Sequence, residues 1–163
     1  MKTQKRFFCI LFLLLTLALA TGSHSGDRKP IKPGSKDKCP VCGMFVAKYP
    51  DWIAEILFRD GSSALFDGAK DMFKYYFNLK RYTPSKAISD IDSIYVTDYY
   101  NLTFIDGTQA YYVIGSDTYG PMGRELIPFK GEEEAKDFLK DHKGKVILKF
   151  KEVTPDIVKR LDD

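Results

Sequence analysis

The sequence is poor in the residues that define several common classes of functional site. Its 163 residues include only three cysteines and two histidines, and its formal net charge is +3. Lys2, Lys5 and Arg6 account for that excess, so the rest of the chain has a net charge of 3 − 3 = 0. Because nucleic-acid binding requires a basic surface, we expect no nucleic-acid partner.

A long hydrophobic run is also absent. The apolar residues 7–20 are too few to span a bilayer, which needs roughly 20. They follow a basic start and end on Ala18-Leu19-Ala20, a small-x-small pattern typical of signal-peptide cleavage. We therefore predict a signal peptide over residues 1–20 and a periplasmic or otherwise exported protein, soluble after cleavage. Cys9 lacks the pattern that precedes a lipid-attachment cysteine, which argues against a membrane tether.

The two remaining cysteines lie in one short stretch, Lys-Cys-Pro-Val-Cys-Gly-Met at residues 38–44. Cys39, Cys42 and Met44 bring two thiols and a thioether within six residues. Soft ligands of this kind select thiophilic ions, and copper(I) is the leading case. A C-x-x-C pair alone also fits half a zinc site, a redox dithiol or a plain disulfide. The adjacent thioether favours copper, since zinc and redox sites do not use one.

The residues after this stretch predict a hairpin followed by a helix. Residues 52–66 contain two strand-like runs separated by Asp60-Gly61, a two-residue hairpin signal. Asp67 is expected to cap a helix that begins near Gly68. The helical spacing of apolar residues places Met72 in the core and not among the ligands.

The same order then recurs. Strands are predicted at residues 94–98 and 102–105, and Asp106-Gly107 predicts a second hairpin whose return strand is 110–114. A helix over residues 132–142 and a strand over 146–150 follow.

The fold class predicted is α+β, with two related β-β-α(-β) units built on antiparallel hairpins and packed into one compact mature protein. The predicted segments after the signal peptide are a flexible leader (21–38), a first ββα unit with the metal loop (39–80), a connector (81–92), a second ββαβ unit (93–153) and a short C-terminal helix (154–163).

Two further residues are candidate ligands outside the metal loop, which we also call the sulfur loop (residues 38–44). Met122 lies in Tyr-Gly-Pro-Met-Gly, residues 119–123, and joins no apolar stripe. It could meet the sulfurs of the first unit, or it could belong to the core. His24 lies in the polar leader, where it is either an additional ligand or a solvated tail residue.

Several motifs together resemble the NosL family, the accessory proteins of nitrous oxide reductase maturation. They are the C-x-x-C-G-M run from Cys39, residues 94–99, residues 110–113, and Gly-Pro-Met-Gly at 120–123 before Leu-x-Pro-Phe at 126–129. The resemblance covers about residues 38–150. It implies copper(I) binding outside the cytoplasmic membrane and delivery toward a copper enzyme. It also implies ligands from the cysteines and methionine of the first motif.

We therefore expect a metallochaperone and not an enzyme. Its ligands would be Cys39, Cys42, Met44 and Met122, and its partners the maturation machinery or an apo copper enzyme. A thiol–disulfide oxidoreductase is one alternative, but its active cysteine should open a helix after a strand. An organomercurial-type thiol protein is another, and it would need a proton donor such as Asp67 or Asp98 beside the thiols. Zinc fits less well, because only two of its four usual ligands are visible.

Overall fold

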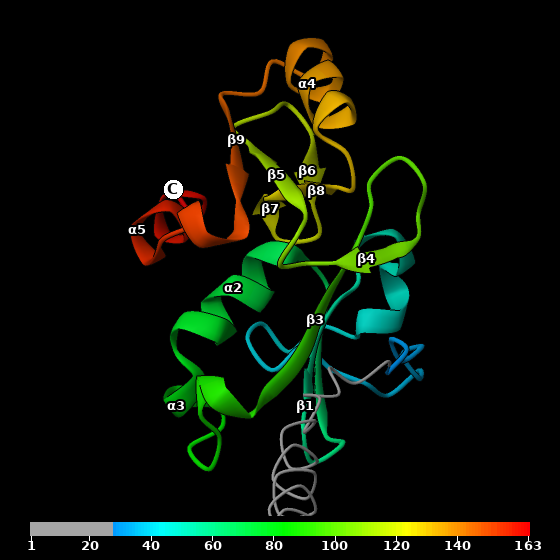
Figure 1. Ribbon diagram of the computed structural model, residues 1–163, viewed down its shortest axis with the longest axis vertical. Coiled ribbons are helices and arrows are strands. Elements are labelled where there is room, and N and C mark those ends of the chain that lie inside the picture. Colours follow the sequence, from blue (N-terminus) through cyan, green and yellow to red (C-terminus); the bar gives the residue numbers. More distant parts are fainter. Residues whose placement is uncertain (1–27) are drawn as a thin grey trace, which may run out of the picture.

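The computed structural model describes residues 28–163 as antiparallel sheets with helices packed against them (Figure 1). The predicted signal peptide (1–20) and His24 lie outside the described residues. None of the described helices is long and apolar enough to cross a membrane. The predicted α+β class is confirmed.

Short groups of helical segments and strands alternate along the chain. The helical segments are η1 (Val46–Lys48), η2 (Pro50–Trp52), α2 (Ala69–Phe77), α3 (Leu79–Tyr82), η3 (Ile88–Asp90), α4 (Glu132–Asp141), η4 (Phe150–Glu152) and α5 (Pro155–Arg160). The strands are β1 (Ala54–Phe58), β2 (Ser63–Phe66), β3 (Ile91–Thr97), β4 (Phe104–Asp106), β5 (Tyr111–Ile114), β6 (Tyr119–Gly120), β7 (Gly123–Arg124), β8 (Ile127–Phe129) and β9 (Val146–Lys149).

The larger sheet has the strand order β2-β1-β3-β4 and carries the main core. The predicted first hairpin is confirmed, because β1 and β2 pair antiparallel with Ala54 opposite Phe66. Every residue of β1 is buried, and α2 packs across β1 and β2. Met72 on α2 is fully buried, as its position on the apolar stripe predicts. Burial of this face holds α2 in place against the sheet.

The predicted second hairpin at Asp106-Gly107 is wrong. Strand β4 pairs with β3, while β5 lies in a separate sheet of order β8-β5-β9. Here tertiary burial overrides the local turn signal, because Val113 of β5 packs with Phe129 of β8 and Phe138 of α4 in a second core. The larger sheet combines β1 and β2 of the first predicted unit with β3 and β4, which belong to the second. The structural similarity of the two units therefore stays a prediction.

A buried carboxyl group fixes the start of α2. Glu125 Oε1 accepts hydrogen bonds from the backbone N–H groups of Lys70 and Leu126. Gly68 gives this group room, since a Cβ there would lie 2.3 Å from Glu125 Oε2. The buried Lys70 Nζ donates to the Met122 carbonyl at 2.7 Å. The β6–β7 hairpin is thus attached to the first turn of α2.

Replacing Glu125 with glutamine should remove a pH dependence of stability. Burial raises the pKa of Glu125 from 4.5 to about 8. A carboxyl group with a raised folded-state pKa contributes stability below its unfolded-state pKa and loses it as pH rises toward the folded-state value. From about pH 5 to pH 8, wild type should therefore lose about 3 kcal/mol of unfolding free energy relative to Glu125→Gln. Urea denaturation measures this, and parallel pH profiles would contradict the assignment.

Candidate metal centre

The sulfur loop is a closed turn. Lys38 and Phe45 form an isolated antiparallel bridge across its base. Inside it, the Cys39 N–H donates to the Met44 carbonyl, and the Gly43 N–H donates to the Cys39 carbonyl, each at 2.9 Å. Gly43 has a φ of +80°, which glycine adopts readily and other residues rarely do. This backbone arrangement turns both cysteines toward the same side of the loop.

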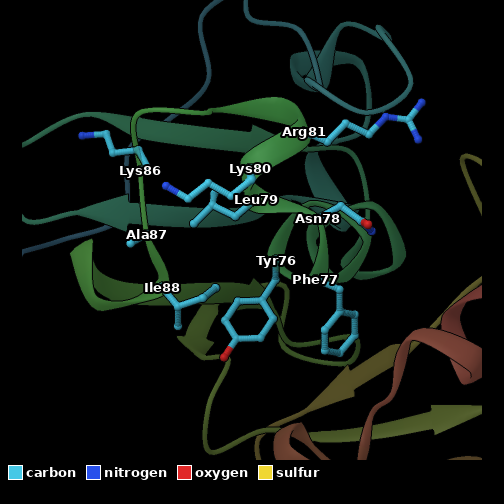
Figure 2. A pocket seen from close by; sticks show the side chains of 9 residues that line it. All are labelled: Tyr76, Phe77, Asn78, Leu79, Lys80, Arg81, Lys86, Ala87 and Ile88. Atoms are coloured by element: carbon cyan, nitrogen blue, oxygen red, sulfur yellow. The ribbon is translucent and has the colours of Figure 1, made fainter.

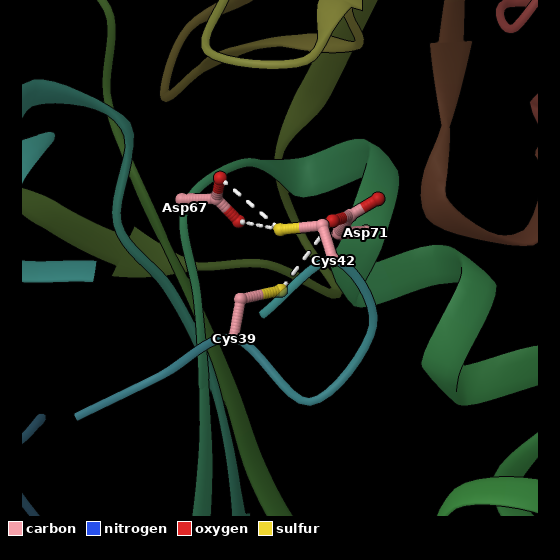
Figure 3. A group of neighbouring side chains, drawn as sticks. All are labelled: Cys39, Cys42, Asp67 and Asp71. Atoms are coloured by element: carbon pink, nitrogen blue, oxygen red, sulfur yellow. Dashed lines mark hydrogen bonds between the residues drawn. The ribbon is translucent and has the colours of Figure 1, made fainter. Parts of the chain in front are cut away.

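The two thiols meet two carboxylates at the start of α2 (Figure 3). Ligand atoms of Cys39, Cys42, Asp67 and Asp71 all lie within 4.8 Å of one another. The Cys39 thiol donates to Asp71 Oδ2 at 3.4 Å, and the Cys42 thiol donates to Asp67 Oδ1 at 3.2 Å. Both cysteines are free thiols. The sequence-predicted pair therefore converges, together with two acids that our ligand set did not include.

The acids reach the cluster from the β2–α2 junction. Asp67 was expected to cap the helix, but α2 begins at Ala69, its N-cap is Gly68, and no side chain caps it. The Asp67 carboxylate instead accepts the hydrogen bond from Cys42. Asp71 lies four residues later, in the first turn of α2, and the two carboxylates lie within 4.8 Å of each other. No local sequence signal identifies either acid, because their contacts with the cysteines span 32 and 25 residues.

Burial keeps both thiols protonated in the metal-free protein. Cys39 is only 1% exposed, and burial raises the pKa of its thiol far above the ordinary range. Burial, together with the nearby carboxylates of Asp71 and Asp67, raises the pKa of Cys42 to about 12. Cys42 is half-buried, so it forms the accessible edge of the cluster. An ion from solvent therefore meets Cys42 first.

The other predicted site residues are Met44, Met122 and Asp98, and their surroundings differ from those of the two cysteines. Met44 is partly buried and closes the loop through its backbone carbonyl. Met122 is 41% exposed at the tip of the β6–β7 hairpin, so it is not a core residue. Asp98 is not beside the thiols: its carboxylate accepts from the Asn101 and Lys130 backbone N–H groups. Of the two candidate proton donors, only Asp67 contacts a cysteine.

A surface groove at the far end of α2 has a different character (Figure 2). It encloses about 400 Å³ between α3 and residues 86–88, which lie within the predicted connector (81–92). Its lining includes Tyr76, Lys80 and Arg81 but no sulfur or carboxylate side chain. The groove therefore lacks the thiol and carboxylate groups that gather at the opposite end of the helix.

Within residues 28–163, the dithiol–diacid cluster is the one group of three or more cysteine, histidine or acidic residues placed to hold a metal. Its position is wrong for an oxidoreductase, because neither cysteine opens a helix that follows a strand. Two thiols and two carboxylates whose ligand atoms lie within 4.8 Å of one another could hold a metal ion.

Comparison with known proteins defines the family. The NosL profile matches residues 30–158, and this chain belongs to the NosL family. The "Copper-binding lipoprotein NosL" of Stutzerimonas stutzeri is 29% identical over 156 residues, covering 86% of this chain and 78% of that protein. The resemblance drawn from the sequence motifs is thereby confirmed.

One solved structure shows the same fold. The crystal structure of the copper chaperone NosL from Shewanella denitrificans matches with a TM-score of 0.69 and 21% identity, over 80% of this chain and 99% of that chain. The solution structure of apo-NosL from Achromobacter cycloclastes matches with a TM-score of 0.46 and 26% identity, over 64% and 87%. The S. stutzeri relative is described as copper-binding and the S. denitrificans protein as a copper chaperone, and neither is described as an enzyme, in agreement with our expectation.

The difference in burial predicts an order of thiol reactivity. In the folded, metal-free protein, iodoacetamide should modify Cys42 faster than Cys39 by roughly tenfold or more, because Cys39 is more buried and harder to ionise. Peptide mass spectrometry at timed intervals measures both rates. In guanidinium the two rates should become similar. Equal rates in the folded protein would contradict the geometry described here.

Proposed function

We propose that this protein is an exported copper(I) metallochaperone that carries copper toward the maturation of a copper enzyme, nitrous oxide reductase. The observation that carries the proposal is the convergence of two free thiols, one buried and one half-buried, within 4.8 Å of each other. The copper-binding description of the S. stutzeri relative supports the choice of metal. Its description as a lipoprotein supports export, although we expect this chain to be soluble after signal cleavage.

The donor set favours copper(I) in particular. Cys39 and Cys42 would supply soft thiolates, and Met44 and Met122 would supply thioethers from two sides. Copper(I) prefers sulfur ligands, whereas carboxylates suit harder ions such as magnesium and calcium. We therefore assign Asp67 and Asp71 the task of holding the thiols and not that of primary ligands.

Loading exchanges thiol protons for the metal. Thiolate is the ligating form, so each bound cysteine must release its proton. Asp67 and Asp71 already accept hydrogen bonds from these thiols, which gives each departing proton an acceptor within 3.4 Å. Proton release also makes copper affinity rise with pH, because both thiols are protonated at neutral pH.

Release follows from the unequal burial of the two cysteines. Cys42 is half-buried and Cys39 is fully buried. An acceptor thiolate or imidazole could enter beside Cys42 while Cys39 still holds the ion. The metal would then pass through a shared intermediate and never become free in solution. In this account the acceptor is apo nitrous oxide reductase or the machinery that assembles it.

Removing the thiols should abolish tight copper binding. We expect Cys39→Ser/Cys42→Ser to lose more than roughly 100-fold in copper(I) affinity, since removal of mere supporting groups around a metal costs 10–100-fold. Anaerobic titration against a chromophoric copper(I) chelator measures the affinity. The same titration with zinc shows whether the loss is specific to copper. An affinity equal to wild type would exclude the cysteines as ligands.

The thioethers are tested by methionine replacement with a matched control. Met44→Leu and Met122→Leu should each weaken copper(I) binding, by roughly tenfold, because leucine keeps the side-chain volume and removes the sulfur. Met72→Leu is the control, since Met72 is a fully buried core methionine on α2. Its copper affinity should match wild type. If Met122→Leu behaves like Met72→Leu in the same chelator titration, Met122 is not a ligand.

A further inference from the structure

The segment that leads into the metal loop is strongly basic. Residues 28–48 contain six lysine and arginine residues and one acidic residue, a net charge of +5. Residues 49–163 contain 16 basic and 20 acidic residues, a net charge of −4. The near-neutral total therefore conceals two regions of opposite sign. The positive region is the one that carries the two cysteines.

Most of these charges are available to a partner. Arg28 is already engaged, because its guanidinium donates to the Phe58 carbonyl and lies 3.9 Å from Asp92. The five lysines of the segment are all exposed: Lys29, Lys32, Lys36, Lys38 and Lys48. Among the described residues, no carboxylate lies within ion-pair distance of any of them. Their charge is therefore not neutralised within this part of the protein.

Two of the lysines lie at the base of the metal loop. Lys38 Nζ is 5.0 Å from the ring centroid of Phe45, and Lys48 Nζ is 5.5 Å from it. Phe45 is 36% exposed, and it pairs with Lys38 in the bridge that closes the loop. Contact with an aromatic ring orients a cation but leaves its positive charge intact. The loop that holds the thiols thus presents an exposed ring between two positive charges.

The β6–β7 hairpin presents a similar pair. Arg124 Cζ lies 5.9 Å from the ring centroid of Tyr119, which is 60% exposed. Met122 lies between them in the sequence and is also exposed. Lys70 holds this hairpin against the first turn of α2, which carries Asp71. We call Lys38, Lys48 and Arg124 the basic rim.

We propose that the basic rim is a docking surface for the protein that receives copper, and that it fits an acidic surface on that partner. This inference rests on the proposed function, because it assumes that the ion leaves through Cys42. An ion that passes directly between ligands requires its acceptor to contact the surface around the donor. Opposite charge accelerates such an encounter, and the negative remainder of the chain repels an acidic partner that approaches elsewhere. The charge distribution would therefore orient the acceptor toward the metal loop.

Charge reversal tests the docking surface. The variant is Lys38→Glu/Lys48→Glu, and the control is Lys143→Glu/Lys145→Glu, two exposed lysines between α4 and β9. The probes are two synthetic acceptor peptides with the same Cys-x-x-Cys pair, one flanked by glutamates and one by lysines. Stopped-flow absorbance measures copper(I) transfer from each loaded protein.

At low salt, wild type and control should load the acidic peptide roughly tenfold faster than the basic one, and salt should reduce this preference. The rim variant should lose the preference while it keeps wild-type equilibrium affinity for copper(I). Equal rates for both peptides with wild type would overturn the proposal. Loss of the preference in the control variant would overturn it as well, because the effect would then follow net charge alone.

A measurement without metal separates this inference from the proposed function. Amide chemical shifts of the metal-free protein are recorded with a glutamate-rich peptide that contains no cysteine. Shift changes confined to residues 38–48 and 119–124 would support docking even if copper binding failed. Shift changes elsewhere would overturn the proposal. Binding of phosphatidylglycerol vesicles through these lysines, with no response to the peptide, would also overturn it and identify a membrane surface.

Discussion

The hydrogen bonds from two cysteine thiols to two aspartates are the interaction on which the site depends. Cys39 and Cys42 belong to a loop with little regular structure, while Asp67 and Asp71 belong to the β2–α2 junction. The thiol–carboxylate contacts attach that loop to the core. The β1–β2 hairpin and the buried face of α2 then hold the two acids in place. Glu125 and Lys70 add the β6–β7 hairpin to the same helix turn.

This arrangement suits a protein that must be stable both with and without its ion. A buried thiolate without a partner would be costly, whereas a neutral thiol can donate a hydrogen bond to a carboxylate. Arrival of a soft cation supplies the charge that makes thiolates favourable in the same place. Unequal burial leaves one cysteine open to exchange while the other is protected. In the proposed function, storage and release of the ion would therefore depend on the same geometry.

Much of this could be predicted from the sequence where a signal was local. The first hairpin, Met72 in the core and the sulfur loop follow from turn chemistry and periodicity. The hairpin at Asp106-Gly107 failed because strand partners are chosen by burial, and Val113 belongs to a different core. Asp67 fits the pattern of an N-cap, yet its carboxylate turns to Cys42, a contact across 25 residues that no local pattern contains.

X-ray absorption at the copper edge, on protein loaded anaerobically with copper(I), tests the central claim most directly. The account predicts a reduced copper ion whose first shell is dominated by sulfur, with the two cysteines as its main contributors. A first shell made mainly of oxygen and nitrogen would contradict it. In that case the carboxylates would hold the ion, and the thiols would be no more than neighbours.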